Sequence, residues 1–339
     1  MIRRKIEVRF AQWKESPNHN PLVVKGCRQC GKTFSVLRFA KEHYEHVIYL
    51  NFFENPVYSE IFSGSLAVDD LVMYITSVLG NDAVFVEGKT CLVLDELQEC
   101  PNARTALKFF KIDGRYDVIC TGSMLGIKGY CEQTSSVPVG YETEIEMYPL
   151  DFEEFLWANG ISNDVVNVLR NCLNNASPVP APLHMRMMEL LLRFVAVGGY
   201  PAVVAEYLAT HDMSNVLRVQ RDIVNGYRDD MVKYAPQKAK SHIRECFDSI
   251  PKQLSKENKK FQYSVIRKGS TAGKYQGSIQ WIEDAGIVRR CHNLTITELP
   301  LDGNADDNVF KLYMADIGLF VSMLEEGTQF DVLQGKLLS

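Results

Sequence analysis

Short apolar runs alternate with helical patterns through the first half of the chain. The runs are expected to form buried strands at 21–24, 46–52, 91–94, 116–120 and 144–148. Apolar residues between them recur at helical spacing, as in 34–43, 66–79 and 103–110, and an amphipathic helix is expected within residues 1–14. No hairpin signal joins two of the runs. This alternation predicts a parallel sheet with helices on both faces and a ligand at the carboxyl ends of the strands.

The second half of the chain is mostly helical in pattern. Helices are predicted over 165–192, 193–210 and 216–234, with a proline-rich loop at 174–182, and together they suggest a helical lid. A helical face at 243–254, a short segment at 263–266, a helix at 272–285 and two strands at 287–294 and 309–315 follow. That order is typical of a winged helix. We therefore divide the chain into a parallel-sheet domain at 1–157, a lid at 158–235, a winged helix at 236–325 and the start of a truncated region at 326–339.

Composition predicts a soluble protein in the cytoplasm. The chain has 339 residues, of which 46% are hydrophobic, which fits a soluble protein of two or three domains. It contains no apolar run of membrane-spanning length and no signal-peptide layout, so no membrane partner is expected. The nine cysteines lack regular pairing and are expected to be reduced thiols.

The charge is distributed unevenly. The whole chain carries −5, whereas residues 236–292 hold twelve basic residues against five acidic ones, a net +7. This reversal indicates an anionic partner, for which double-stranded DNA is the candidate, or else a solvated basic face.

A phosphate-binding loop is the clearest motif in the sequence. Residues 26–33 read GCRQCGKT, which matches G-x-x-x-x-G-K-[ST]. Gly26 and Gly31 allow the tight turn that directs backbone N–H groups at a nucleotide phosphate. Lys32 is expected to reach the β- and γ-phosphates, and the Thr33 hydroxyl to complete a Mg²⁺ shell. The loop follows a predicted strand and opens a predicted helix, whose amino-terminal dipole also favours phosphate.

Two cysteines lie inside this loop. Cys27 and Cys30 form a C-x-x-C, but no second cysteine or histidine pair exists to complete a zinc shell. They are therefore expected to be incidental to metal chemistry, although their oxidation would block nucleotide binding.

A second nucleotide motif lies about 60 residues further on. The run CLVL ends in Asp95-Glu96, as expected for a buried strand that delivers an aspartate to Mg²⁺. The adjacent Glu96 is expected to polarise the attacking water. The strand at 116–120 ends in Thr121-Gly122-Ser123, where a hydroxyl can sense the γ-phosphate or simply form a turn.

These motifs together resemble a known family. GCRQCGKT, LVLDELQECP, TGS, YPLDFEEFL, VGGYP and KLYMADIGL occur in its order and cover nearly the whole chain. The family comprises bacterial and archaeal ATP-binding proteins with an AAA+-like domain, AAA family 14, and a carboxyl-terminal domain catalogued as DUF4143.

The resemblance implies an α/β P-loop NTPase fold with an additional strand in its parallel sheet. It implies ATP and Mg²⁺ as cofactors, with Thr33 and Asp95 near the metal, Lys32 and Glu96 as catalytic residues and Ser123 as first sensor. Pro201, in Gly199-Tyr200-Pro201, resembles an element near the adenine, and a helix-breaking turn is the other interpretation. The nucleotide-binding residues implied are Gly26, Cys27, Arg28, Gln29, Cys30, Gly31, Lys32, Thr33, Phe34, Asp95, Ser123 and Pro201.

The chain departs from the family pattern in two places. Many relatives carry a basic residue, a candidate arginine finger, where this chain has Tyr141 after Gly140. Slow turnover is therefore expected unless another subunit of a homo-oligomer supplies an arginine. Relatives also continue into a nuclease-like domain, whereas this sequence stops at Ser339.

The sequence thus favours a Mg²⁺-dependent ATPase whose nucleotide state controls a winged-helix module. The alternative is a nucleotide-gated switch that holds ATP or ADP with negligible turnover. A small-molecule kinase is disfavoured because Asp95-Glu96 suits water activation and no acceptor-site motif is found. The winged helix would bind DNA through the helix at 272–285, with Lys256, Lys259, Lys260, Arg267, Lys268 and Lys274 at phosphates, or would dock a protein.

Overall fold

The computed structural model describes residues 2–124, 140–325 and 327–336. The chain divides into two compact units. The first comprises Arg4–Tyr148, and the second runs from Pro149 onward and includes the first residues of the chain. We describe each unit separately.

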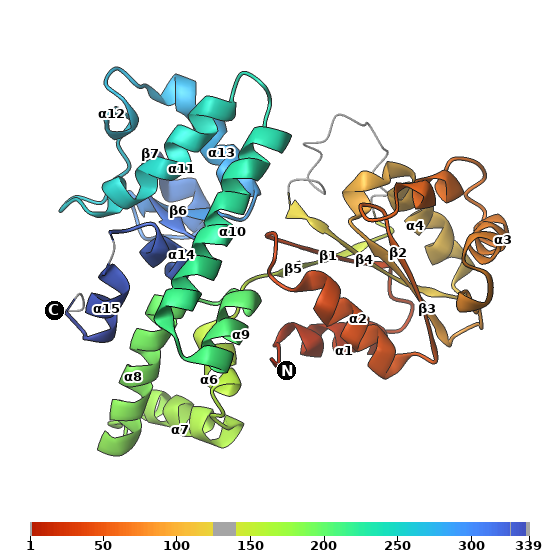
Figure 1. The fold of residues 1–339 in the computed structure, drawn as a ribbon, viewed down its shortest axis with the longest axis horizontal. Helices are drawn as coiled ribbons and strands as arrows, with labels where there is room; N and C mark the ends of the chain where they lie inside the picture. Colours follow the sequence, from red (N-terminus) through yellow and green to blue (C-terminus); the bar gives the residue numbers. More distant parts are fainter. Residues whose placement is uncertain (1, 125–139, 326, 337–339) are drawn as a thin grey trace. The chain divides into compact units, whose positions relative to one another are not determined.

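A five-stranded parallel sheet forms the centre of the first unit (Figure 1). Its order is β2-β3-β4-β1-β5, so β4 lies between β3 and β1. The strands are β1 (Leu22–Gly26), β2 (His46–Asn51), β3 (Thr90–Asp95), β4 (Asp117–Ser123) and β5 (Thr143–Met147). All four pairings are parallel. The predicted α/β class and the parallel sheet with an additional strand are confirmed.

Helices cover both faces of this sheet. In Figure 1, α1 (Ile6–Glu15) and α2 (Lys32–His43) lie on one side, and α3 (Val68–Leu79) and α4 (Pro101–Asp113) on the other. Alternate residues of the strands, such as Leu92 and Leu94, join α3 and α4 in one apolar core. The near-continuous apolar runs in the sequence reflect strands that are buried on both faces. Short 3₁₀ helices η1 (Pro56–Phe62), η2 (Gly80–Asp82) and η3 (Leu97–Glu99) complete the unit.

The second unit begins with five helices. They are α6 (Phe152–Ala158), α7 (Asn163–Asn174), α8 (Ala181–Val197), α9 (Pro201–Thr210) and α10 (Met213–Tyr234). Helix α6 starts with a capping box between Asp151 and Glu154. The expected break at Arg193 is wrong, because α8 continues to Val197 and ends only where Gly198 adopts a φ of 77°. The helical region predicted after the sheet is present, and its function as a lid stays a prediction.

Three helices and a two-stranded sheet follow in the order expected from the sequence. These are α11 (Lys240–Leu254), α12 (Tyr263–Ile266), α13 (Ala272–Asp284), β6 (Val288–Leu294) and, after η4 (Leu301–Asn304), β7 (Ala305–Met314). Strands β6 and β7 are antiparallel. The chain then forms α14 (Ile317–Ser322) and α15 (Thr328–Leu333). The assignment of this region as a winged helix stays a prediction.

A buried aspartate of the second unit joins three sequence stretches that carry the family resemblance. Asp316 accepts hydrogen bonds from the backbone N–H groups of Gly199 (2.7 Å) and Leu319 (2.8 Å). The Gly199 carbonyl in turn accepts one from the Leu150 N–H at 2.7 Å. A Cβ atom on Gly199 would lie 2.0 Å from the Leu150 carbonyl oxygen, so only glycine fits there. The stretches YPL, VGGYP and ADIGL therefore meet at one junction.

None of the described helices is both long and apolar enough to cross a membrane.

Candidate nucleotide site

The loop between β1 and α2 has the backbone that a phosphate cradle requires. Gly26 ends β1, and a Cβ atom there would lie 2.2 Å from the Met147 carbonyl oxygen. Gln29 and Gly31 have φ values of 62° and 95°, in the left-handed region. Gly31 precedes the first turn of α2, and no described side chain caps that helix. Its first N–H groups therefore suit an anion.

Lys32 lies folded along this loop. Its Nζ donates to the carbonyl oxygens of Gly26 (3.1 Å) and Cys27 (2.9 Å), and the residue is buried. The ammonium is thus held at the loop, where the sequence predicted it to meet phosphate oxygens.

Asp95 ends β3 and receives hydrogen bonds from four side chains, while only 2% of its surface is exposed. Thr33 Oγ1 lies 3.0 and 3.1 Å from its two carboxylate oxygens. The Tyr49 hydroxyl donates at 2.7 Å and Asn51 Nδ2 at 3.1 Å, and the Thr121 hydroxyl donates to Oδ1. A carboxylate beside a threonine hydroxyl is an oxygen donor set that suits Mg²⁺.

Sequence reasoning predicted the Thr33–Asp95 pair but missed the other three donors. Burial, and then the hydrogen bond to Asp95, raise the pKa of Tyr49 well above its usual range. A signal for two of them was available. Asn51 and Thr121 are polar residues at the carboxyl-terminal ends of β2 and β4, the edge where ligands of parallel sheets gather.

Glu96 follows Asp95 and turns the chain out of the sheet. Its φ and ψ of 57° and 50° are left-handed, and the residue is partly exposed. Gln98 Nε2 donates to Glu96 Oε2 at 2.5 Å. The same amide accepts from the backbone N–H of Ser123 at 3.3 Å, through Oε1. Ser123 lies beside Gly26 in the sheet register, so the predicted first sensor is next to the start of the loop.

The two cysteines of the loop are buried and interact. A hydrogen bond from Cys27, and to a lesser degree the cations Lys32 and Arg4, outweigh burial and lower the pKa of Cys30. Arg4 also supports the loop from outside the motif, because its Nη1 donates to the Cys30 carbonyl at 3.0 Å. Its Nη2 donates to the Tyr148 carbonyl at 2.6 Å. No sequence motif pointed to Arg4.

The other predicted site residues lie outside the hydrogen-bonded cluster around Asp95. Arg28 is exposed in the loop, and Phe34 is 57% exposed in the first turn of α2. Pro201 begins α9 and belongs to the second unit, so its relation to a nucleotide stays a prediction. At the position lacking an arginine finger, Lys108 Nζ lies 5.4 Å from the Tyr141 ring centre.

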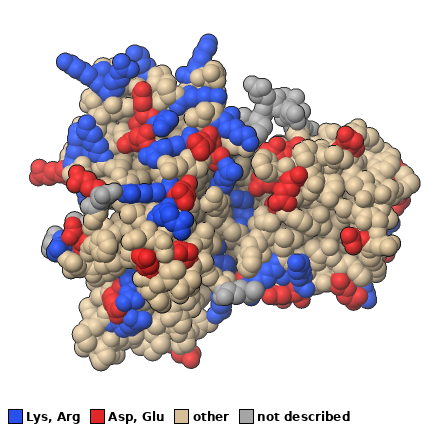
Figure 2. Space-filling model, viewed as in Figure 1, with Lys and Arg blue, Asp and Glu red and all other residues tan. Residues whose placement is uncertain are grey.

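The second unit carries a basic surface. In Figure 2, Lys and Arg side chains gather on the part of this unit that is formed by α11, α12 and α13. On α13, Lys274 and Gln276 are exposed and each lies next to a glycine, Gly273 or Gly277. A Cβ atom on either glycine would meet nothing within 4 Å. Tyr275, by contrast, faces inward and donates to Glu245 at 2.6 Å.

The connection between β6 and β7, together with the first residues of β7, has the opposite character. Residues 295–308 contain four acidic residues and no basic one. Ile296, Leu299 and Leu301 are exposed there, Leu299 at 87%.

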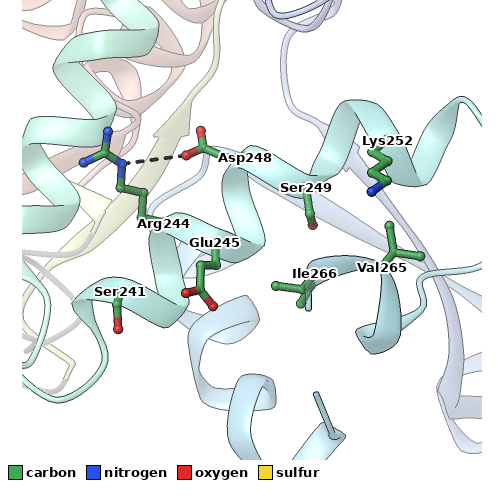
Figure 3. A pocket seen from close by; sticks show the side chains of 8 residues that line it. All are labelled: Ser241, Arg244, Glu245, Asp248, Ser249, Lys252, Val265 and Ile266. Atoms are coloured by element: carbon green, nitrogen blue, oxygen red, sulfur yellow. Dashed lines mark ion pairs between the residues drawn. The ribbon is translucent and has the colours of Figure 1, made fainter. Parts of the chain in front are cut away.

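A cavity of about 470 Å³ lies beside α11 and α12 (Figure 3). Its lining comprises Ser241, Arg244, Glu245, Asp248, Ser249, Lys252, Val265 and Ile266. Arg244 pairs with Asp248 at 3.7 Å, and two acidic residues offset two basic ones, so the lining has no net charge to select an anion.

Comparison with known proteins identifies the first unit. Residues 18–156 match the family model AAA_14, described as an AAA domain. They form an AAA-like P-loop ATPase domain. This AAA domain is followed by residues 188–329, which match the domain of unknown function DUF8612. DUF8612 thus stands where the family resemblance implied DUF4143, and that part of the resemblance is corrected.

Solved structures match the chain at low sequence identity, and one of them has a TM-score above 0.5. A Walker-type ATPase of Pyrococcus abyssi matches with a TM-score of 0.54 and 14% identity, over 95% of this chain and 96% of that one. The ORC2 protein of Aeropyrum pernix, in ADPNP–ADP complexes, gives a TM-score of 0.45 and 12% identity over 98% and 92%. The RuvB Holliday junction branch migration motor of Thermotoga maritima gives 0.35 and 12% over 86% and 90%. No curated protein sequence matches the chain significantly.

Proposed function

We propose that this chain binds ATP with Mg²⁺ and hydrolyses it at the AAA domain. The observation that carries the proposal is the Thr33–Asp95 contact, 3.0 Å between the phosphate-loop hydroxyl and a strand-end carboxylate 62 residues away. These two oxygen donors would hold Mg²⁺, which when bound neutralises charge on the phosphates. Lys32 and the first turn of α2 would bind the β- and γ-phosphates.

Glu96 is the general base in this proposal. A water oxygen bonds to the γ-phosphorus while the bond from that phosphorus to the β–γ bridging oxygen breaks, and Glu96 takes the proton of the water. Partial exposure leaves its carboxylate accessible to water, whereas buried Asp95 is surrounded by donors. The two neighbouring acids therefore have different roles.

Two substitutions test these assignments. Lys32→Ala removes the phosphate cation and is expected to abolish nucleotide binding, measured by calorimetry with ATP. Glu96→Gln keeps the size of the side chain and is expected to retain binding while turnover falls by about 10²–10⁴-fold. Undiminished hydrolysis by Glu96→Gln would contradict the catalytic assignment.

The alternative is a switch that holds nucleotide with negligible turnover. Tyr141, which stands where relatives carry a basic residue, favours it. Turnover per chain that rises with protein concentration would argue against the switch, because a second copy would then be supplying an arginine.

We further propose that the basic surface of the second unit binds double-stranded DNA as a winged helix, under control of the nucleotide state. The support is the exposed face of α13, where a lysine and glutamines stand beside glycines whose side-chain positions are open. Glycine at an exposed helix position lowers helix stability by about 1 kcal/mol relative to alanine. A partner that approaches the helix backbone closely would account for glycine at these positions. The acidic connection at 295–308 would repel phosphates, so the contacts belong to α13 and not to the wing.

The DNA test compares matched double variants. Lys268→Ala with Lys274→Ala should reduce the salt slope of log affinity by about 2 for a 30-base-pair duplex, measured by fluorescence anisotropy. Lys41→Ala with Lys108→Ala, two exposed lysines of the first unit, should leave the slope unchanged. Steady-state ATP hydrolysis with and without duplex, at low salt and at about 0.2 M, then tests coupling. Equal slopes for both pairs would refute binding at this surface.

A further inference from the structure

Gln98 connects the ends of two strands at the nucleotide site. It lies in η3, two residues after Glu96. Its amide nitrogen donates to Glu96 Oε2 at 2.5 Å, and its amide oxygen accepts from the Ser123 N–H at 3.3 Å. One side chain thus links the carboxylate after β3 to the last residue of β4.

The geometry fixes which way this amide faces. A backbone N–H can only donate, so the Gln98 atom facing Ser123 must be the oxygen. The NH₂ group is then directed at Glu96, whose carboxylate oxygen accepts the hydrogen bond. The Glu96 backbone is already committed to a left-handed conformation, so the remaining freedom of its carboxylate lies in the side chain.

We infer that Gln98 is a positioning residue for Glu96. It holds the carboxylate in one orientation and makes that orientation depend on the end of β4. Ser123 pairs in register with Gly26, where the phosphate loop starts, so a displacement of that strand end by bound nucleotide reaches Glu96 through a single amide. The inference rests on the proposed function, because it concerns the base of that reaction.

If Gln98 only stabilised η3, the expected results would be different. Gln98→Met keeps the length of the side chain and its packing but has no amide, so it separates filling space from hydrogen bonding. We expect Gln98→Met to lower kcat by about 10- to 100-fold with KM and ATP affinity changed less than about threefold, because a misoriented base loses rate and not binding. Glu99→Gln, an exposed change in the same turn, is the control and should match the unaltered chain.

The second measurement does not depend on turnover. In chains labelled with ¹⁵N, the side-chain amide signal that disappears in Gln98→Met belongs to Gln98. It should shift in Glu96→Ala, which removes its carboxylate partner, and should stay in place in Glu99→Gln.

The outcomes distinguish failure of the positioning role of Gln98 from failure of the proposed hydrolysis. An unaltered kcat in Gln98→Met, or a Gln98 amide signal that is unmoved by Glu96→Ala, overturns the positioning role even if the chain is an ATPase. A chain that binds ATP but does not hydrolyse it refutes the proposed hydrolysis, and the amide signal then decides alone whether Gln98 holds Glu96. Reduced kcat together with a shifted amide signal supports the inference.

Discussion

Two buried aspartates show how differently the two units use the same side chain. Asp95 in the AAA domain accepts from the hydroxyls of Thr33, Tyr49 and Thr121 and from the amide of Asn51. Asp316 in the second unit accepts from backbone N–H groups of Gly199 and Leu319. Hydroxyls rotate and can accept as well as donate, whereas a backbone N–H in a packed junction is fixed and can only donate. The first environment can therefore rearrange around a ligand, and the second is a permanent joint.

The largest effect should come from Asp95→Asn. We expect turnover to fall at least about 100-fold, because the carboxylate that is proposed to hold Mg²⁺ is lost. The free energy of unfolding should change by less than about 1 kcal/mol, because the surrounding hydroxyls can turn to accept from the new NH₂ group. Steady-state hydrolysis and urea unfolding measure the two quantities. A large loss of stability would mean that this environment is as fixed as the one around Asp316.

The same substitution at Asp316 should have the opposite outcome. Asp316→Asn directs an NH₂ group at a backbone N–H that cannot reverse, so we expect a loss of about 1–3 kcal/mol in urea unfolding. Asp212→Asn is the control: Asp212 caps α10 through the Ser214 N–H at 2.8 Å, is exposed, and asparagine caps equally well. Equal stabilities for the two variants would contradict the fixed-joint interpretation.

Glycines around the joint allow a finer test. A Cβ atom on Gly318 would lie 2.4 Å from the Val197 carbonyl oxygen, so Gly318→Ala should cost about 1–3 kcal/mol through overpacking. Gly226 lies inside α10 and a Cβ atom there would meet nothing within 4 Å. Gly226→Ala should therefore stabilise the chain by about 0.5–1 kcal/mol. Changes of the same sign would show that the junction can expand.

The smallest expected effect concerns the thiols of the two units. Cys30 in the phosphate loop has its pKa lowered, mainly by the hydrogen bond from Cys27, whereas burial raises the pKa of Cys246 in α11 to about 12. Cys30 should therefore form its thiolate at a lower pH than an ordinary thiol, about 8.5, while Cys246 stays protonated. The ¹³C chemical shifts of the cysteine Cβ atoms, followed between about pH 6 and 9, measure both titrations without reagent access to the buried sulfurs. A Cys30 signal that stays as constant as that of Cys246 would contradict the contrast.

The sequence was most informative where one segment carries both structure and chemistry. The loop at 26–33 and the Asp95-Glu96 strand end could be predicted because their spacing along the chain is itself the motif. Strands β1 and β3 could be predicted because burial on both faces leaves an apolar run, whereas β5 alternates between polar and apolar residues at the sheet edge.

What the sequence could not supply was contact between distant segments. Tyr49 reaches Asp95 only because β2 pairs with β3, and Gln98 reaches Ser123 only because β3 pairs with β4. Gly199 and Asp316 are 117 residues apart, and no local pattern predicts the hydrogen bond from the Gly199 N–H to the Asp316 carboxylate. The predicted helices divide between Leu192 and Arg193, whereas α8 continues to Val197 and carries Arg193 on a partly exposed face.

The strand order also has a consequence for how the chain folds. Gly26 pairs in register with Ser123 and with Met147, so the phosphate loop gains its first neighbour in the sheet after 97 further residues and has both neighbours only after 121. At about 5–20 residues per second, synthesis takes roughly 6–24 s to provide them. Pairings this distant in sequence also close slowly. ATP can therefore contribute nothing to the earliest stages of folding, and a nascent chain interrupted before β4 would expose its phosphate loop without a sheet to hold it.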